Sequence, residues 1–456
     1  MAKRKSVFVC QECGYESPKW MGQCICGAWN SFVEEVVRDE PKSVRPSMQK
    51  GPGSLAVPVS EVSVSSGRRI DTGLKELNRV LGGGIVEGSL TLISGEPGIG
   101  KSTIITQAAS YISQNEGPVL YVSGEESARQ IKIRADRVCK GDLSRLYLLS
   151  ETDLDKVEET IEKLSPVFLI IDSIQTMYTE ALDAAPGSVS QVRACGNALL
   201  SIGKGRNIPV FIVAHVTKSG ELAGPKIVEH MVDTVLSFVG ERNQDLRILR
   251  CLKNRFGTTS EIGAFEMREE GLAEIDNLSG SFLEGLEDGV CGAAATAVYE
   301  GTRPLLLEVQ ALTGTTNVGF ARRTAIGIDN QRLSMIIAVL EKKAGLTLIN
   351  RDVYVNIVGG LHPEGTSTDL AVAAAVWSDE KGVPIPSDTL IIGEIGLTGD
   401  LRPVQSAEKL AAEAARLGFK KMIRPQRNLE RMLKKPTGLA FAGVKSVSEA
   451  LHIFDK

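Results

Sequence analysis

The sequence has few aromatic residues and no long apolar run. Phe, Trp and Tyr make up 5% of its 456 residues, so we expect cores built from aliphatic side chains. No apolar stretch approaches the roughly 20 residues of a membrane-spanning helix, which predicts no membrane association. The first ten residues, MAKRKSVFVC, are charged and lack the following apolar stretch of a secretory signal. We therefore expect a cytoplasmic protein.

The sequence also lacks an excess of charge of either sign. Its 52 Lys and Arg residues against 56 Asp and Glu give a net charge of −4. Binding to nucleic acid would therefore have to rest on local basic patches. The composition, 43% hydrophobic and 24% charged, is typical of a soluble globular protein, and the length predicts two or three domains.

Cysteine is sparse after the first thirty residues. Four of the eight cysteines stand alone and are expected to be small buried apolar residues. The other four form a C-x-x-C pair and a C-x-C pair, Cys10, Cys13, Cys24 and Cys26. A reducing compartment disfavours disulfides, whereas two close pairs can place four thiolates around Zn²⁺. A segment with so few apolar residues needs such a metal to fold.

Composition divides the chain into three blocks and a linker. Residues 1–33 form the cysteine module, which we interpret as a C4-type zinc finger, and residues 34–66 form a linker rich in Pro, Ser and charge. Residues 67–275 alternate apolar strand-like runs with helical patterns, which predicts an α/β fold with a mainly parallel sheet covered on both faces. A segment rich in Gly, Asp and Glu then precedes an α+β block at residues 285–456.

The α/β block contains a phosphate-binding loop. Its eight residues match G-x-x-x-x-G-K-[ST] in full and run Gly95, Glu96, Pro97, Gly98, Ile99, Gly100, Lys101 and Ser102. An apolar strand precedes the loop and a helical pattern follows it, as the motif requires. Backbone N–H groups and the helix dipole then attract the phosphates. We expect Lys101 to bind the β- and γ-phosphates of ATP and Ser102 to hold Mg²⁺.

Three other strands end in a polar side chain. Asp172 ends an apolar strand about 70 residues after the loop, which predicts a second group in the Mg²⁺ shell. Glu125 ends another and is a better candidate than Glu126 for the base that activates water. The alternative is that both glutamates only place favourable charge at the start of the next helix. His215 ends a third strand, where it is either a γ-phosphate sensor or a structural histidine.

Several segments together resemble the RadA (Sms) family of bacterial DNA repair proteins, within the RecA/KaiC/DnaB superfamily. They are the glycine-rich stretch before the P-loop, the sequence KNRFG at 253–257, the N-terminal cysteines and the C-terminal block. The resemblance implies a RecA-like ATPase core with a zinc finger and a Lon-protease-like domain. It implies a DNA-dependent, helicase-like ATPase that forms a homo-oligomer, expected to be a hexameric ring.

The same resemblance implies partners and a function in recombinational DNA repair. Proteins of this family bind single-stranded and branched DNA and promote branch migration together with RecA. Two other readings of the sequence remain open. One is a KaiC-like regulatory ATPase that does not act on DNA, and the other is a Lon-like ATP-dependent protease.

Residue roles carry over from the family by position. Glu125 takes the place of the catalytic glutamate, and His215 falls where RecA has a γ-phosphate-sensing glutamine. Lys253 and Arg255 fall where RecA has paired lysines that reach the nucleotide of a neighbouring subunit. A fixed cation there stabilises charge in the transition state. The alternative is that Lys253 and Arg255 are charges at an exposed strand end.

DNA contacts are expected from two loops that face a central channel. The first comprises residues 179–192, and the second comprises residues 216–230, with Lys218 and Lys226 among glycines. Flexible backbone with lysine suits contact along a phosphate backbone. Taken singly, each lysine is equally explained as a solvated surface charge.

Two positions depart from the family pattern. RadA proteins usually carry C-x-x-C in the second cysteine pair, so Cys24-x-Cys26 implies a tighter zinc knuckle or a weakened site. In the C-terminal block, Ser367 falls near the serine of Lon, but Glu408 occupies the position of its activating lysine. A carboxylate cannot replace a neutral amine base, and Lys409 is turned away by about 100° on a helix.

The C-terminal domain is therefore expected to be proteolytically inactive. We interpret it as a scaffold for assembly and DNA contact. Its basic residues, such as Arg322, Arg323, Arg402 and Lys409, are candidates for that contact, with a solvated surface as the alternative.

Overall fold

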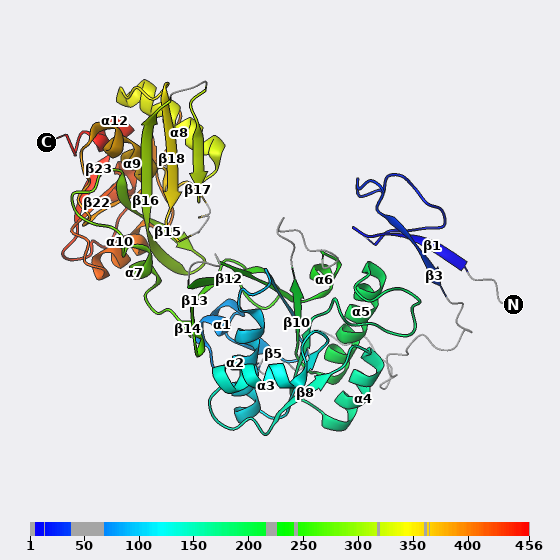
Figure 1. Cartoon of the computed structure of the whole chain (residues 1–456). Helices are drawn as coiled ribbons and strands as arrows, with labels where there is room; N and C mark the ends of the chain where they lie inside the picture. The colour runs from blue at the N-terminus through cyan, green and yellow to red at the C-terminus, as the bar shows by residue number, and fades with distance from the viewer. Residues whose placement is uncertain are drawn as a thin grey trace, which may run out of the picture. The chain divides into compact units, whose positions relative to one another are not determined.

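The computed structural model describes residues 5–12, 14–37, 68–215, 226–240, 245–316, 320–359, 363 and 365–455. The chain divides into two compact units, Met1–Glu274 and Ile275–Lys456 (Figure 1). Within the described residues, no helix is both long enough and apolar enough to span a membrane.

A small antiparallel sheet forms at the N-terminus. Its strands, in the spatial order β2-β1-β3, are β2 (Glu16–Ser17), β1 (Lys5–Cys10) and β3 (Phe32–Val37). Only a handful of side chains are buried among them: Cys10, Cys24 and Phe32, with Phe8 and Met21 packed alongside. A core of this size cannot by itself hold the segment together, which agrees with a metal-dependent module.

A nine-stranded sheet with the order β14-β13-β12-β11-β6-β10-β9-β7-β8 organises the rest of the first unit. Six strands are parallel: β6 (Leu90–Gly95), β7 (Val119–Ser123), β8 (Leu146–Ser150), β9 (Phe168–Asp172), β10 (Val210–His215) and β11 (Thr234–Val239). Three strands extend it in antiparallel fashion: β12 (Leu246–Asn254), β13 (Ile262–Arg268) and β14 (Gly271–Glu274). The predicted mainly parallel sheet is confirmed.

Helices cover both faces of this sheet. One core joins it to α1 (Lys75–Val80), α2 (Lys101–Asn115) and α3 (Ala128–Val138). A second core, on the other face, joins it to α4 (Leu154–Leu164), α5 (Val189–Arg206) and α6 (Lys226–Met231). Both cores are mostly Ile, Leu and Val, as the low aromatic content predicts. A short ribbon, β4 (Arg69–Ile70) with β5 (Ile85–Val86), leads into β6.

The second unit has its own sheet of seven strands in the order β17-β18-β16-β15-β19-β22-β23. Its strands are β15 (Ala293–Glu300), β16 (Arg303–Thr315), β17 (Arg323–Ile326), β18 (Arg351–Ile357), β19 (Thr389–Ile391), β22 (Lys421–Pro425) and β23 (Ala440–Val444). Its long helices are α8 (Asn330–Ala344), α9 (Asp369–Lys381) and α10 (Ala407–Arg416). This α+β arrangement agrees with the block pattern of the sequence.

Shorter elements complete the second unit. They are α7 (Leu278–Phe282), α11 (Gln426–Glu430), α12 (Val447–Leu451), β20 (Glu394–Ile395) and β21 (Leu401–Arg402).

The second unit contains a buried carboxylate, Asp369, at the start of α9, which is 1% exposed. Arg332 of α8 compensates it through Nε, which donates to Asp369 Oδ1 at 3.2 Å, and through Nη2, which pairs with Oδ2. Burial still raises the pKa of Asp369, against the lowering by Arg332.

We predict that Arg332→Met destabilises the second unit by about 3–5 kcal/mol, because it leaves Asp369 buried without a counter-charge. The matched control is Arg416→Met, which removes the pair of Arg416 Nη2 with Glu413 at 2.7 Å on an exposed helix surface. That change should cost less than about 1 kcal/mol. Denaturant unfolding of the full chain measures both, and equal losses would contradict the buried-pair account.

Candidate nucleotide and metal sites

The P-loop lies between β6 and α2, at the carboxyl end of the parallel strands. Gly100, the residue before α2, has φ of +118°, and a Cβ there would lie 2.9 Å from Met267 Cε. Only glycine fits this position without strain. No side chain caps the N-terminus of α2, so its first N–H groups are left to bind an anion. The loop therefore has the backbone geometry that phosphate binding requires.

Lys101 is folded back over the loop. It is 3% exposed, and its Nζ donates to the carbonyl oxygens of Gly95 at 2.7 Å and Glu96 at 2.9 Å. Burial lowers the pKa of Lys101 to about 8, although Asp172, Glu125 and Glu96 favour the charged form. An ammonium held in this way gains from any phosphate that enters the site, because it exchanges partial carbonyl charges for full negative charge.

Ser102 and Asp172, the two residues predicted to hold Mg²⁺, lie next to each other in the site. Ser102 Oγ donates to Asp172 Oδ2 at 2.9 Å, and the Tyr121 hydroxyl donates to the same oxygen at 2.6 Å. A hydroxyl beside a carboxylate is the oxygen donor set that suits Mg²⁺, so the residues present fit this ion. Burial and then Asp172 raise the pKa of Tyr121 well above its usual range, which keeps it a neutral donor. No sequence pattern had identified Tyr121 as part of this site.

Glu125 and His215 lie next to each other at the ends of β7 and β10. Ser173 Oγ donates to Glu125 Oε1 at 2.5 Å, and His215 Nε2 lies 3.4 Å from Glu125 Oε2. The carboxyl ends of parallel strands meet at one edge of the sheet, which is why residues ninety positions apart converge. One oxygen of Glu125 is thus fixed by Ser173, and the other faces the histidine.

A cavity of about 410 Å³ joins these residues into one site. Lys101, Ser102, Glu125, Asp172 and His215 all line it, together with Pro97, Gly98, Gly100 and Thr103 of the loop region. Glu126, the lesser candidate for the base, also lines it, and sequence reasoning missed the remaining residues, Arg134, Arg137, Arg247 and Met267. Arg134 pairs with Glu126, and Arg247 Nε donates to the Ile99 carbonyl at 3.1 Å. These arginines make the cavity favourable for a polyanion.

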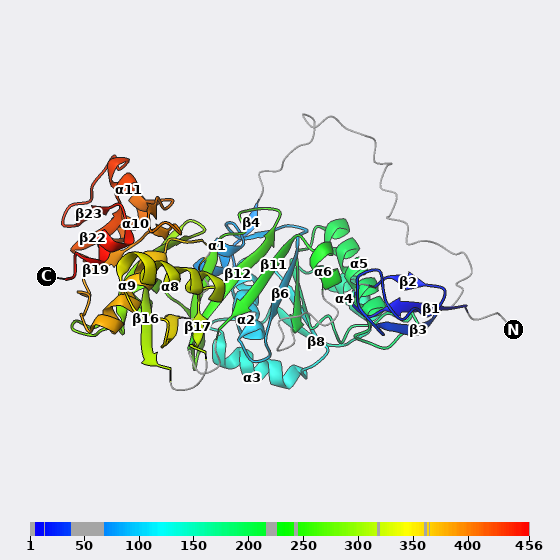
Figure 2. The ribbon, with the colours of Figure 1, turned by 90° about the horizontal axis from the view of Figure 1, so that it is seen from above.

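Lys253 and Arg255 lie at the opposite edge of the sheet. β12 is antiparallel to β11, so Asn254 pairs with Thr234 at the start of β11, and Thr234 pairs with Thr91 at the start of β6 (Figure 2). The P-loop follows the other end of β6. A six-residue strand is roughly 17 Å long, so the two basic residues cannot reach the P-loop of their own chain.

Lys253 is partly held by backbone carbonyls. Its Nζ donates to Glu229 O at 2.8 Å and His230 O at 3.3 Å, at the end of α6. Burial and then the nearby Arg255 lower the pKa of Lys253. Arg255 has a side chain that is 58% exposed, with Nη1 at 3.3 Å from Asp233 Oδ1. Of the two, Arg255 is the one that faces outward.

Three of the four N-terminal cysteines form a cluster. The sulfur atoms of Cys10, Cys24 and Cys26 lie within 4.8 Å of one another, and Cys10 Sγ is 3.9 Å from Cys26 Sγ. A zinc tetrahedron with 2.3 Å arms has edges of about 3.8 Å, so this spacing fits Zn²⁺. Cys13 lies outside the described residues. The shortened Cys24-x-Cys26 pair therefore does not prevent both sulfurs from facing Cys10.

The structure describes the first of the two loops predicted to contact DNA in full and the second only in part. In the first, Gln191 is 1% exposed and fixes the loop, since its Nε2 donates to Thr179 O and Leu182 O at 3.1 and 3.0 Å. This loop carries Glu180 and Asp183 but no lysine or arginine, and its last residues already belong to α5. Any DNA contact from residues 179–192 would therefore have to come from backbone and uncharged polar groups, and the predicted contact stays a prediction.

In the second loop, Lys218 lies outside the described residues. Lys226 begins α6, a helix that ends at Met231, so the last residues of the predicted loop are helical.

In the second unit, the residues at the Lon-like positions do not form a dyad. Glu408 Oε1 accepts a hydrogen bond from Leu433 N at 2.6 Å, and Lys409 Nζ donates to Tyr299 Oη at 2.6 Å. Both line a cavity of about 520 Å³ whose lining does not include Ser367. No general base contacts the Ser367 hydroxyl among the described residues.

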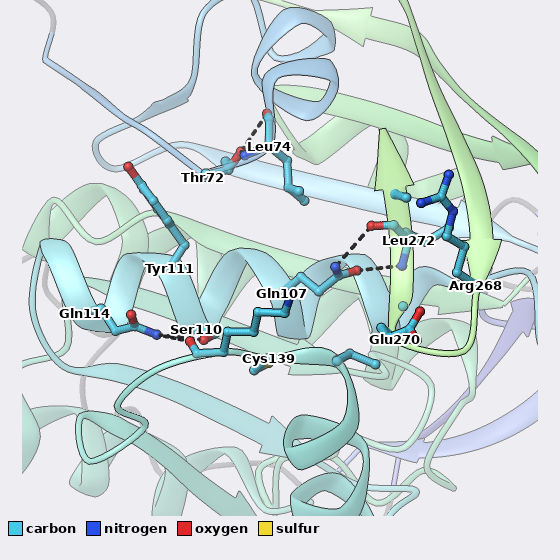
Figure 3. A pocket seen from close by; sticks show the side chains of 15 residues that line it. Thr72, Leu74, Gln107, Ser110, Tyr111, Gln114, Cys139, Arg268, Glu270 and Leu272 are labelled. Atoms are coloured by element: carbon cyan, nitrogen blue, oxygen red, sulfur yellow. Dashed lines mark hydrogen bonds between the residues drawn. The ribbon is translucent and has the colours of Figure 1, made fainter. Parts of the chain in front are cut away.

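Another cleft, of about 610 Å³, lies along the outer face of α2 (Figure 3). Gln107 exchanges hydrogen bonds with the backbone of Leu272 at 3.1 and 3.0 Å, and Gln114 donates to Ser110 Oγ and Lys140 O. These polar groups are already hydrogen-bonded to other protein atoms, and no P-loop residue lines the cleft. It is separate from the nucleotide site.

Family models match three parts of the chain. A rubredoxin metal binding domain matches residues 8–34, an AAA domain matches residues 57–221, and the subunit ChlI of Mg-chelatase matches residues 308–428. The architecture is thus a zinc ribbon, a RecA/KaiC-like P-loop ATPase core and a ChlI/Lon-like domain. Its cofactors are ATP, Mg²⁺ and Zn²⁺, and the chain is an ATPase.

Full-length relatives are similar over nearly every residue. DNA repair protein RadA of Bacillus subtilis is 50% identical over 455 residues, with 99% of both chains covered. The RadA proteins of Halalkalibacterium halodurans and Listeria monocytogenes are 49% and 48% identical, over 99% of this chain and 99% and 98% of theirs. A solved KaiC-like protein from Pyrococcus horikoshii, covering 46% of this chain and 99% of its own, is 19% identical with a TM-score of 0.39. On the full-length relatives, the chain belongs to the RadA family of DNA repair proteins.

Proposed function

We propose that the protein is a DNA-dependent, helicase-like ATPase of recombinational DNA repair that works as a homo-oligomeric ring. The observation that carries this proposal is the separation of Lys101 and Arg255 on opposite edges of one sheet. Such an arrangement suits a ring in which each subunit completes the ATP site of the next. Family membership supports DNA as the partner. The proposal extends to single-stranded and branched DNA as substrates, to branch migration together with RecA, and to a hexameric ring.

Within one subunit, the described residues divide the work of hydrolysis. The P-loop backbone and Lys101 bind the phosphates. Ser102 and Asp172 hold Mg²⁺, which supplies charge neutralisation at the phosphate oxygens. Glu125, with one oxygen fixed by Ser173, accepts the proton of the attacking water. His215, beside the other oxygen, detects whether a γ-phosphate is present.

The neighbouring subunit supplies the remaining cation. Arg255 stabilises the charge that develops on the transferred phosphoryl group, and Lys253 assists by fixing the end of α6. A cation supplied across an interface makes hydrolysis depend on assembly. The first unit in this way couples ring formation to turnover.

The flanking domains have supporting functions. The zinc ribbon is held by Cys10, Cys13, Cys24 and Cys26. In the ChlI/Lon-like domain, Glu408 is bound to the Leu433 backbone and no base contacts Ser367 among the residues that the structure describes. The domain has no peptidase activity and acts as a scaffold with basic residues for DNA. Arg323 is largely satisfied by backbone carbonyls, including Leu348 O at 2.7 Å, whereas Arg402 is 59% exposed. Arg402 is therefore the better candidate for a DNA contact.

We predict that single-stranded DNA raises the ATPase rate several-fold and that Lys101→Ala lowers turnover below a tenth with or without DNA. The lysine's charge serves the phosphates rather than the fold. Lys101→Met is the control, because it keeps the buried stem and should unfold no earlier than wild type at neutral pH. A rate that DNA leaves unchanged would instead favour the KaiC-like regulatory ATPase.

We predict that Arg255→Ala keeps ATP binding and loses turnover by about 10³-fold, the low end for a missing arginine finger. Mixing it with Lys101→Ala subunits should restore part of the activity, since some interfaces pair an intact P-loop with an intact Arg255. Turnover is measured after mass analysis has verified mixed rings. Absence of recovery in such rings would leave Arg255 without a role in trans.

We predict one zinc per chain. Serine at Cys10, Cys24 or Cys26 should lower the zinc content measured by elemental analysis, because the thiolates are the ligands. Serine at Cys291, a cysteine outside the cluster, is the matched control and should leave the zinc content unchanged. Metal-free wild-type protein would show that the shortened second pair does not support the site.

A further inference from the structure

Asp233 is a buried carboxylate at the point where three segments meet. It is 2% exposed and follows α6. Its Oδ2 accepts from Lys204 Nζ at 2.7 Å and from Leu90 N at 3.0 Å, and its Oδ1 lies 3.3 Å from Arg255 Nη1. Its backbone is engaged as well, since its N donates to Leu90 O at 3.0 Å and its O accepts from Arg255 N at 3.1 Å. Asp233 thus connects the end of α6, the start of β6 and the KNRFG turn.

This contact pattern holds one end of the Arg255 guanidinium and leaves the rest exposed. Burying a carboxylate is costly unless cations and donors satisfy it. Lys204 and the Leu90 N–H satisfy one oxygen, so the other oxygen is left for Arg255. The side chain of Arg255 is nonetheless 58% exposed. Its guanidinium has five N–H donors in a fixed plane, so one held nitrogen still leaves others to face outward.

The turn that carries Arg255 is fixed by further contacts. Arg69 Nη2 donates to Phe256 O at 2.8 Å, and Lys204 Nζ lies 5.9 Å from the centre of the Phe256 ring. Lys204 thus contacts both Asp233 and the residue after Arg255. A cation that must meet a transferring phosphoryl group gains from such preorganisation, because a misplacement of about 1 Å costs about 10²-fold in rate.

We propose that Asp233 is a positioning residue, which orients Arg255 of its own subunit toward the ATP site of the neighbouring subunit. The proposal rests on the proposed function of Arg255 in trans. Asp233 does not touch the nucleotide. It fixes one nitrogen of the guanidinium, and the nitrogens that remain free meet the γ-phosphate across the interface.

A purely structural role for Asp233 predicts a different result. Its bond to Leu90 N anchors the start of β6, the strand that leads to the P-loop of the same chain. If that anchor were its whole purpose, a change at Asp233 would damage the nucleotide-binding side of its own subunit. The two roles therefore differ in what an Asp233 variant loses. A positioning role affects the cation given to the neighbouring subunit, whereas a structural role affects the P-loop of the same subunit.

We predict that Asp233→Asn in the full-length protein lowers kcat by about 10²-fold with KM for ATP unchanged. The amide keeps an oxygen acceptor for Leu90 N and loses the charge that holds Arg255. Mixed rings of Asp233→Asn with Lys101→Ala should regain activity, whereas mixed rings with Arg255→Ala should not. The double variant Asp233→Asn/Arg255→Ala should be no slower than Arg255→Ala alone.

Glu87→Gln is the matched control, because Glu87 precedes β6 at the same edge and, within the described part of the chain, accepts a hydrogen bond only from the exposed Asn207 side chain at 3.1 Å. Its turnover should equal that of wild type. Should Asp233→Asn not fold, Asp233→Glu decides the question, since it keeps the charge and shifts the carboxylate by one methylene. Wild-type kcat in the folded Asp233 variant would overturn the proposal, as would recovery with Arg255→Ala instead of Lys101→Ala.

Failure of the proposed function gives a different result. If Arg255→Ala itself turned over like wild type, or did not complement Lys101→Ala, the arrangement in trans would be wrong whatever Asp233 does. If Arg255→Ala complements Lys101→Ala and Asp233→Asn does not, only the positioning role is wrong.

Discussion

The length of one strand separates the two groups of charged residues on which the ATPase depends. β6 has the P-loop at its carboxyl end and Leu90, bound to Asp233, at its amino end. β11 runs parallel to β6, and β12 returns antiparallel to bring the KNRFG turn back to the amino end. Hydrogen bonds along both ladders keep these strands in register. No side-chain movement can therefore bring Arg255 to Lys101 within one chain, and the ATP site as proposed is complete only between two subunits.

The electrostatics of the ATP site follow from its position at the carboxyl edge. Lys101 is buried beneath loop carbonyls, and this burial lowers the pKa of its ammonium group to about 8. A folded-state pKa below the ordinary value means that the charged lysine costs stability at neutral pH. That cost falls as the pH rises from about 8 towards the ordinary value of 10.5. Bound phosphate reduces the same cost without a change of pH, so the electrostatic cost of burying this ammonium favours ATP binding.

Much of the first unit could be predicted from the sequence, because its signals are local. The P-loop motif, the strand-ending Asp172, Glu125 and His215, and the alternation of strands and helices all lie in short segments. Parallel strands bring such ends together whatever the length of the connections. β8 was harder to recognise, since it lies at the sheet edge and none of its residues is fully buried.

The residues that sequence reasoning missed become functional only through register and packing. Tyr121 contacts Asp172 because β7 lies beside β9, and nothing in its own strand distinguishes it from a core residue. Ser173, the residue that follows β9, donates a hydrogen bond to Glu125. Asp233 has no motif around it, and its importance follows from the junction of α6, β6 and the KNRFG turn. Gln191 likewise has no motif around it, and its role in fixing the loop at 179–192 follows only from the packing of α5 against that loop.

The segment from Glu229 to Asp233 lies at the amino edge of the sheet, where it contacts both basic residues of the KNRFG turn. The chain passes from His215, beside Glu125 at one edge, through residues 216–225 to α6. The end of α6 then receives Lys253, and Asp233 receives Arg255. About fifteen residues of chain therefore separate His215 from the segment that holds Lys253 and Arg255, the side chains proposed to act on the neighbour's ATP.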